Sequence, residues 1–114
     1  MKGIWLGIIG IMLLLVGCSR SVDGRLVCVN RLCDSNDADS AIAVLKDVCR
    51  DSLSEHSRYY YDLMSIKARD KAYQDITGDT IITDIISYFE RNGSEAELGE
   101  AYYFGGRVRR DRLI

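Results

Sequence analysis

The cysteines and the single histidine carry the most reactive side chains of this 114-residue sequence. Cys28, Cys33 and Cys49 precede His56, and a zinc ion takes four nitrogen or sulfur ligands of these kinds. The ligands of one ion must converge, whereas a separation of five residues places Cys28 and Cys33 about 140° apart around a helix. We therefore favour thiols buried on separate helices over a zinc site, and we expect no metal and no other cofactor.

Two further kinds of thiol chemistry remain open. A disulfide is compatible with an oxidising compartment, but antiparallel packing of the helices that carry Cys28 and Cys49 would separate the two by about 9 Å along the axis. Nucleophilic catalysis requires Cys49 and His56 to meet across a helix break, together with a third group that orients the histidine. No thiol-hydrolase signature surrounds them. We interpret His56 as a polar residue near a helix start and predict that the protein is not an enzyme.

The fourth cysteine, Cys18, ends an apolar N-terminal run. Residues 1–3 supply one positive charge, and residues 4–16 carry none. As a helix, those 13 residues span about 20 Å, whereas the hydrocarbon core of a bilayer is about 30 Å thick. The run is therefore short for a permanent span and typical of a secretory signal. It closes with Leu15, Val16, Gly17 and Cys18.

These four residues resemble the lipobox of bacterial lipoproteins. The resemblance implies that Leu15, Val16 and Gly17 are recognised by the signal peptidase, and that the Cys18 thiol carries a diacylglyceryl group with acyl chains such as palmitate. Residues 1–17 would then be a signal peptide, 18–21 a lipidated tether and 22–114 the folded domain. Two or more acyl chains make anchoring stable. Ser19 follows the cysteine in place of the aspartate that retains many lipoproteins in the inner membrane, so we expect an envelope protein of the outer membrane.

Helical periodicity of apolar residues runs through the rest of the chain. Asp37 is the predicted N-cap of the second helix, and Asp79 caps the fourth. Gly93 tolerates the left-handed conformation that ends a helix. Ser94 and Glu97 have the spacing of a capping box at the start of the fifth. The predicted helices cover residues 21–34, 38–50, 55–73, 79–92 and 94–112.

An internal repeat indicates how these helices are arranged. Residues 60–66 align with residues 102–108 at an offset of 42, and both segments start with paired tyrosines. Repeats of this length built from helix pairs form solenoids. We therefore predict an all-α fold of antiparallel helix pairs, although residues 26–29 are also compatible with a strand.

Four segments in this order resemble the N-terminal part of tetratricopeptide-repeat lipoproteins of Bacteroides-type bacteria: residues 36–45, 60–71, 79–82 and 101–108. The resemblance implies a short TPR-like solenoid of two helix pairs and one unpaired helix, which serves as a scaffold for protein contacts. It also implies a set of residues that pack between repeats. These are Tyr60, Leu63, Ala68, Ile82, Ile86, Tyr102 and Gly106.

The last predicted helix departs from the family pattern. Gly106 fits the glycine at which paired helices approach each other, but Gly105 stands where leucine is expected and Arg109 where tyrosine is expected. The partner helix of residues 94–112 is missing, so we expect a truncated member of the family. The helix should fray beyond the two glycines or be covered in a dimer, which makes the protein a monomer or a weak homodimer.

Two surface features have competing interpretations. Tyr59, Tyr60 and Tyr61 form either an aromatic platform or, as we favour, a core residue with two half-buried neighbours. The arginines near the C-terminus either bind an anionic surface or, as we favour, form a solvated helix end. They are Arg107, Arg109, Arg110 and Arg112.

The formal charge of −2 gives no reason to expect nucleic-acid binding. With 47% apolar and 28% charged residues, the chain is not wholly disordered. We therefore expect a lipid-anchored, non-catalytic helical-repeat scaffold whose partners are the membrane and another protein. The alternatives are a small structural envelope lipoprotein with an incidental repeat likeness, and a Cys/His enzyme or zinc protein.

Overall fold

The structure is a computed structural model that describes residues 21–113, and this part of the chain is all-helical. It contains no strand, so the strand-like interpretation of residues 26–29 is wrong: they lie within the first described helix. The elements are α2 (Gly24–Asp34), α3 (Ala38–Asp47), the 3-10 helix η2 (Arg50–Ser52), α4 (Glu55–Lys71), α5 (Ile82–Asn92) and α6 (Glu95–Leu113).

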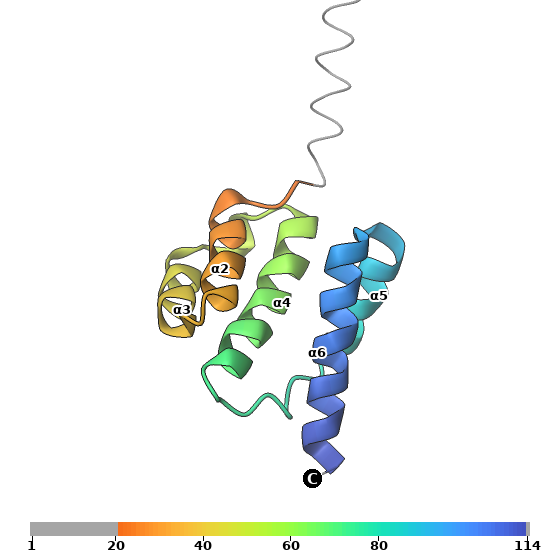
Figure 1. The fold of residues 1–114 in the computed structure, drawn as a ribbon. Helices are drawn as coiled ribbons and strands as arrows, with labels where there is room; N and C mark the ends of the chain where they lie inside the picture. The colour runs from red at the N-terminus through yellow and green to blue at the C-terminus, as the bar shows by residue number, and fades with distance from the viewer. Residues whose placement is uncertain (1–20, 114) are drawn as a thin grey trace, which may run out of the picture.

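The helices are arranged around α4. In Figure 1, α2, α4 and α6 stand in a row, with α3 beside α2 and α5 beside α6. Contacts join helices that are neighbours or next-but-one along the chain, and α4 touches all the other helices. Helix α5 packs more extensively on α6 than on α4, while α3 and α5 do not touch within the described part. The predicted last helix is therefore covered along one side by both α4 and α5.

The core lies where the other helices meet α4. Each helix contributes fully or almost fully buried apolar side chains at helical spacing, so each presents one apolar face to its neighbours. The largest fully buried side chains are Leu26, Val29, Cys33, Leu63, Met64, Ile66, Ile76, Ile85 and Phe89, of which Ile76 lies between α4 and α5.

Two of the predicted helix caps are confirmed. The Asp37 carboxylate accepts the backbone N–H of Ser40 at 3.3 Å, which caps α3. At the start of α6, the Ser94 hydroxyl accepts the backbone N–H of Glu97 at 3.2 Å, and the Glu97 carboxylate accepts the backbone N–H of Ser94 at 2.9 Å. This reciprocal pair satisfies two amides that have no partner within the helix.

Other helix ends differ from the prediction. Helix α3 stops at Asp47, and α4 stops at Lys71 because Tyr73 adopts a left-handed φ of 61°. Asp79 does not cap α5, which starts at Ile82; its carboxylate instead pairs with Arg69 of α4 at 3.0 Å. A long-range ion pair has taken the place of a local cap.

Gly93 ends α5 by close approach and not by a left-handed turn. Its φ of −92° and ψ of 159° are extended, so the predicted left-handed cap is wrong. A Cβ at this position would lie 2.8 Å from a ring carbon of Phe89. The absence of a side chain therefore lets the α5–α6 turn pass over the buried Phe89 ring.

Helix α6 has a different register from the one that the repeat resemblance implied. Tyr102 is 50% exposed, and Gly106 is exposed with open space around it. Gly105 is the glycine of close approach instead, because its Cβ would lie 2.7 Å from Cδ1 of Ile86. Packing roles for Tyr102 and Gly106 are therefore wrong. The physical reason is a rotation of the buried face by one residue, about 100°.

The burial pattern supports this register. Ala101, Phe104, Gly105 and Val108 are buried in α6, and the residues 41 positions earlier in α4 are buried as well. The remaining predicted packing residues face inward: Tyr60, Leu63, Ala68 and Ile82 are buried, and Ile86 is half-buried.

The second half of α6 remains helical through both glycines to Leu113. Arg107 ties it to α4 through two hydrogen bonds to the Asp70 carboxylate, at 3.2 and 2.8 Å. This bidentate ion pair lies on the segment for which fraying was expected.

Candidate functional site

The predicted lipidation site, Cys18, lies outside the described residues, and so do the predicted signal-peptidase recognition residues Leu15, Val16 and Gly17. Among residues 21–113, no helix is long and apolar enough to cross a membrane.

The three described cysteines are free thiols in different surroundings. Cys33 is buried, whereas Cys28 and Cys49 are exposed, so the interpretation of all three as buried thiols is wrong for two of them. Burial raises the pKa of the Cys33 thiol, which keeps it protonated. Over the described range, no three histidine, cysteine or acidic side chains are grouped so that they could hold a metal ion.

His56 is a buried link between three helices. It is only 4% exposed, although it is the second residue of α4. Its Nε2 lies 2.8 Å from the carboxylate of Glu97 in α6, and its Nδ1 lies 3.0 Å from the hydroxyl of Tyr88 in α5. The ring also meets Phe89 edge-on, with centroids 5.5 Å apart. The interpretation of His56 as a polar residue at a helix start missed this role.

The histidine orders the aromatic side chains beside it. Nε2–H donates to the Glu97 carboxylate and Nδ1 is hydrogen-bonded to the Tyr88 hydroxyl, so that both ring nitrogens are engaged. The Tyr88 ring in turn stacks on Tyr59 of α4, with centroids 4.0 Å apart and planes 8° from parallel. The chain Glu97–His56–Tyr88–Tyr59 therefore leads from the buried interior to the surface between α4 and α5.

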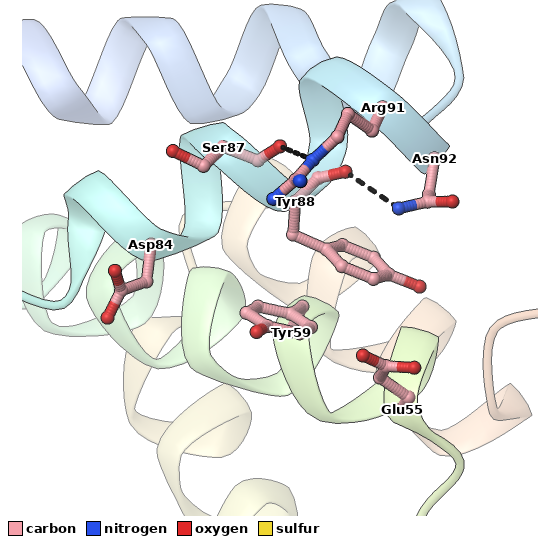
Figure 2. A pocket seen from close by; sticks show the side chains of 7 residues that line it. All are labelled: Glu55, Tyr59, Asp84, Ser87, Tyr88, Arg91 and Asn92. Carbon is pink, nitrogen blue, oxygen red and sulfur yellow. Dashed lines mark hydrogen bonds between the residues drawn. The ribbon is translucent and has the colours of Figure 1, made fainter.

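A polar groove of about 440 Å³ opens at this surface (Figure 2). Three charged side chains line it: Glu55 from α4, and Asp84 and Arg91 from α5. None of the three has an ion-pair partner within the described structure. The other lining residues are Tyr59, Ser87, Tyr88 and Asn92.

The position of the Arg91 guanidinium is set by its own helix. Its Nε donates to the backbone carbonyl of Ser87, one turn earlier, at 3.3 Å. The guanidinium is thereby folded back along α5 towards Asp84, and its terminal nitrogens remain available in the groove. Figure 2 shows the rings of Tyr59 and Tyr88 near the centre, with Glu55 on one side and Ser87 and Arg91 on the other. The groove thus combines one cation, two anions and an aromatic surface.

A second buried polar cluster surrounds Lys67 of α4. This lysine is 3% exposed, and its ammonium contacts Asn30 Oδ1 at 2.6 Å, Asp34 Oδ1 at 2.9 Å and the carboxylate of Glu100. Burial by itself lowers the pKa of Lys67, but the hydrogen bonds from Glu100 and Asp34 outweigh it, so the pKa lies above its ordinary value. The cluster joins α2, α4 and α6. Nothing in the sequence beyond the residue types indicates that these side chains meet.

A more apolar groove of about 380 Å³ lies between α4 and α6, over this cluster. Its walls include Lys71, Gly99, Tyr103 and Phe104. Tyr103 is 62% exposed, and the neighbouring Tyr102 donates its hydroxyl hydrogen bond to Glu90 of α5 at 2.9 Å.

The favoured interpretation of the three consecutive tyrosines is confirmed. Tyr60 is buried, and burial raises the pKa of its phenol. Tyr59 and Tyr61 are half-buried, and the Tyr61 hydroxyl donates to the backbone carbonyl of Leu45 at 3.2 Å. Of the C-terminal arginines, Arg107 is paired and Arg109 is exposed, while the side chains of Arg110 and Arg112 lie outside the described set.

Comparison of the chain with protein-family models, with curated proteins and with solved structures gives no match. The geometry assigns two kinds of role. The His56 and Lys67 clusters hold the helices together, whereas the two grooves leave polar and aromatic side chains open at the surface.

Proposed function

We propose that this chain is a lipid-anchored, TPR-like helical-repeat scaffold of the cell envelope that binds another protein and catalyses no reaction. The anchor rests on the resemblance of residues 15–18 to a lipobox. The scaffold role rests on the helical domain that follows.

The arrangement of the helices carries the scaffold proposal. Contacts between neighbours and next neighbours, with α2, α4 and α6 in one row, are the pattern of a helical-repeat array. Such arrays bind partners along the row of helices. Here the row carries the groove between α4 and α6, with Tyr103 exposed at its edge. Exposed tyrosines beside an apolar groove are typical of protein-binding surfaces.

The surroundings of His56 support the non-catalytic part of the proposal. Both ring nitrogens are engaged, one by Tyr88 and the other by Glu97. A Cys49 thiolate therefore has no imidazole nitrogen from which to receive activation, because nucleophile and base must be hydrogen-bonded.

The anchor is tested with Cys18→Ala in cells labelled with radioactive palmitate. We expect the full chain to incorporate label and the variant to lose it, because the diacylglyceryl group is attached to that thiol. Cys28→Ala is the matched control, since Cys28 is an exposed thiol in the folded domain. Equal labelling of the Cys18→Ala variant and the unsubstituted chain would refute the lipid anchor.

The scaffold role is tested with a photo-crosslinking amino acid at Tyr103 in the native envelope. We expect one discrete protein adduct at this position. The matched control is the same amino acid at Lys46, an exposed residue on α3 outside the row of α2, α4 and α6. The same adducts at both positions, or none at Tyr103, would count against a partner bound to this groove.

A further inference from the structure

The polar groove of Figure 2 lies at the end of the molecule where the chain enters it. Ser21 is fixed there, because the hydroxyl of Ser57 in α4 donates to its carbonyl at 3.4 Å and accepts the backbone N–H of Asp23 at 3.1 Å. Ser57 is itself buried. Figure 1 shows the start of α4 and the α5–α6 turn at this same end, and the C-terminus of α6 at the opposite end.

The length of the tether determines what this end faces. Three residue steps separate Cys18 from Ser21, and an extended chain covers at most about 11 Å in that distance. With Cys18 lipidated, as the proposed function has it, the start of α4 and the end of α5 lie at the lipid headgroups. The headgroup region of one leaflet is itself several ångströms thick. The groove between α4 and α5 therefore opens into that region.

The two charges on the α5 wall of the groove are ordered along this direction. Arg91 is in the last turn of α5, at the anchored end, and Asp84 is two turns deeper on the same face of the helix. The return of Arg91 towards Ser87 brings its guanidinium to within about one turn of Asp84. On the α5 wall a cationic group thus lies nearer the bilayer and an anionic group farther from it, while Glu55, the first residue of α4, stands at the anchored end of the opposite wall.

We propose that this groove binds the headgroup of a zwitterionic phospholipid with a primary ammonium, of the phosphoethanolamine class. The phosphate, which is attached to the glycerol and lies nearer the bilayer, pairs with the Arg91 guanidinium. The terminal ammonium donates to Asp84 and lies beside the stacked rings of Tyr59 and Tyr88, which attract a cation. The order of the two charges along α5 matches the order of charges in the lipid.

Glu55 adds selectivity from the opposite wall. With Asp84, it makes the groove net negative, which disfavours a purely anionic headgroup. A quaternary ammonium carries no N–H and therefore cannot donate a hydrogen bond to Asp84. The groove should accordingly prefer phosphoethanolamine to phosphocholine and to phosphoglycerol.

The first test uses the full chain with Cys18→Ala in detergent solution, titrated with glycerophosphoethanolamine and followed by backbone amide NMR. We expect saturable shifts in α5, and a loss of affinity of about fivefold or more in both Arg91→Gln and Asp84→Asn. Arg31→Gln and Asp47→Asn make the same charge changes at exposed positions outside the groove and should leave binding unchanged.

Two ligand controls distinguish the headgroup from its parts. Equal affinity for glycerophosphocholine would overturn the hydrogen bond to Asp84. Equal affinity for inorganic phosphate would show that only the guanidinium acts and would overturn the headgroup assignment. In vesicles, the lipidated chain should show slower amide exchange over residues 84–91 with phosphatidylethanolamine than with phosphatidylcholine. Equal amide exchange in the two lipids would also overturn the headgroup assignment.

The outcome for the groove is separable from the outcome for the anchor. Absence of saturation, in a chain whose Cys18 is labelled in cells, refutes the headgroup site and leaves the anchor in place. Saturation in a chain whose Cys18 takes no label refutes the anchor, and with it the bilayer as the source of the headgroup.

Discussion

The two adjacent glycines of α6 allow a sharp test of how this helix is rotated. Gly106 has open space around it, so Gly106→Ala adds a methyl group at no steric cost. Alanine is favoured over glycine in a helix interior by about 1 kcal/mol. We therefore expect Gly106→Ala to raise the free energy of unfolding by about that amount, which corresponds to a Tm increase of about 4–8 °C for a domain of this size.

Gly105→Ala should have the opposite effect. Its new Cβ would lie 2.7 Å from Cδ1 of Ile86, so that Ile86 must retreat by about 1 Å to restore ordinary contact. Overpacking of this kind costs about 1–3 kcal/mol, which exceeds the gain of about 1 kcal/mol in helix propensity. The expected result is a net loss of about 1 kcal/mol, and so a difference of about 2 kcal/mol between the two alanine variants.

The assay is urea denaturation of the full chain, followed by circular dichroism at 222 nm. Ile86→Val removes the clashing Cδ1 atom, so it should rescue Gly105→Ala by about 1 kcal/mol beyond additivity. If Gly105→Ala is stabilising and Gly106→Ala destabilising, the buried face of α6 is rotated by one residue, and the register implied by the repeat resemblance is correct after all.

Three further predictions concern the core and the polar clusters. Ile85→Asp should lower the free energy of unfolding by about 3 kcal/mol or more, because the side chain is fully buried; an unchanged urea midpoint would place this residue outside the core. Ser94→Ala removes the hydroxyl that accepts the Glu97 N–H and should cost about 1 kcal/mol, whereas no loss of thermal stability would mean that the capping box is not used. Lys67→Met should cost about 2–4 kcal/mol, since Glu100 loses its buried partner. Because the pKa of Lys67 is raised above 10.5, the stability that its charged form contributes is fully present below pH 10.5 and is lost as pH rises through the folded-state pKa. The free energy of unfolding of the Lys67→Met variant should therefore fall less steeply at alkaline pH than that of the unsubstituted chain. An equal fall in the two chains would contradict this.

The positions of the helices were predictable because their signals are local. Asp37 and the pair Ser94 and Glu97 act on amides two or three residues away, so the sequence around them is sufficient to locate the start of a helix. The end of α5 shows the limit of such signals. Gly93 was correctly placed at a helix end, but the reason is the Phe89 ring beneath it, not a left-handed turn.

The site was not predictable because its parts are far apart in the chain. His56 meets Tyr88 and Glu97, which follow it by 32 and 41 residues. The periodicity of apolar residues in the sequence does not indicate that three helices converge on one imidazole. The sequence does not indicate the rotation of α6 for a related reason. Tyr102 aligns with Tyr60 in the internal repeat, whereas burial in α6 is decided by Ile86 on the facing helix.

The central position of α4 has a consequence for how the domain unfolds. In a long array of repeats, terminal units can detach one at a time, because each is held only by its neighbour and the two ends share no partner. Here Asp70 and Lys67 of α4 bind directly to α6, past the intervening α5, and Lys67 also binds α2. Loss of either end therefore removes partners from the same central helix. The α-helices of residues 21–113 should open together in a single cooperative transition and not unzip from one terminus. Native-state hydrogen exchange should then give α2 and α6 a common opening free energy.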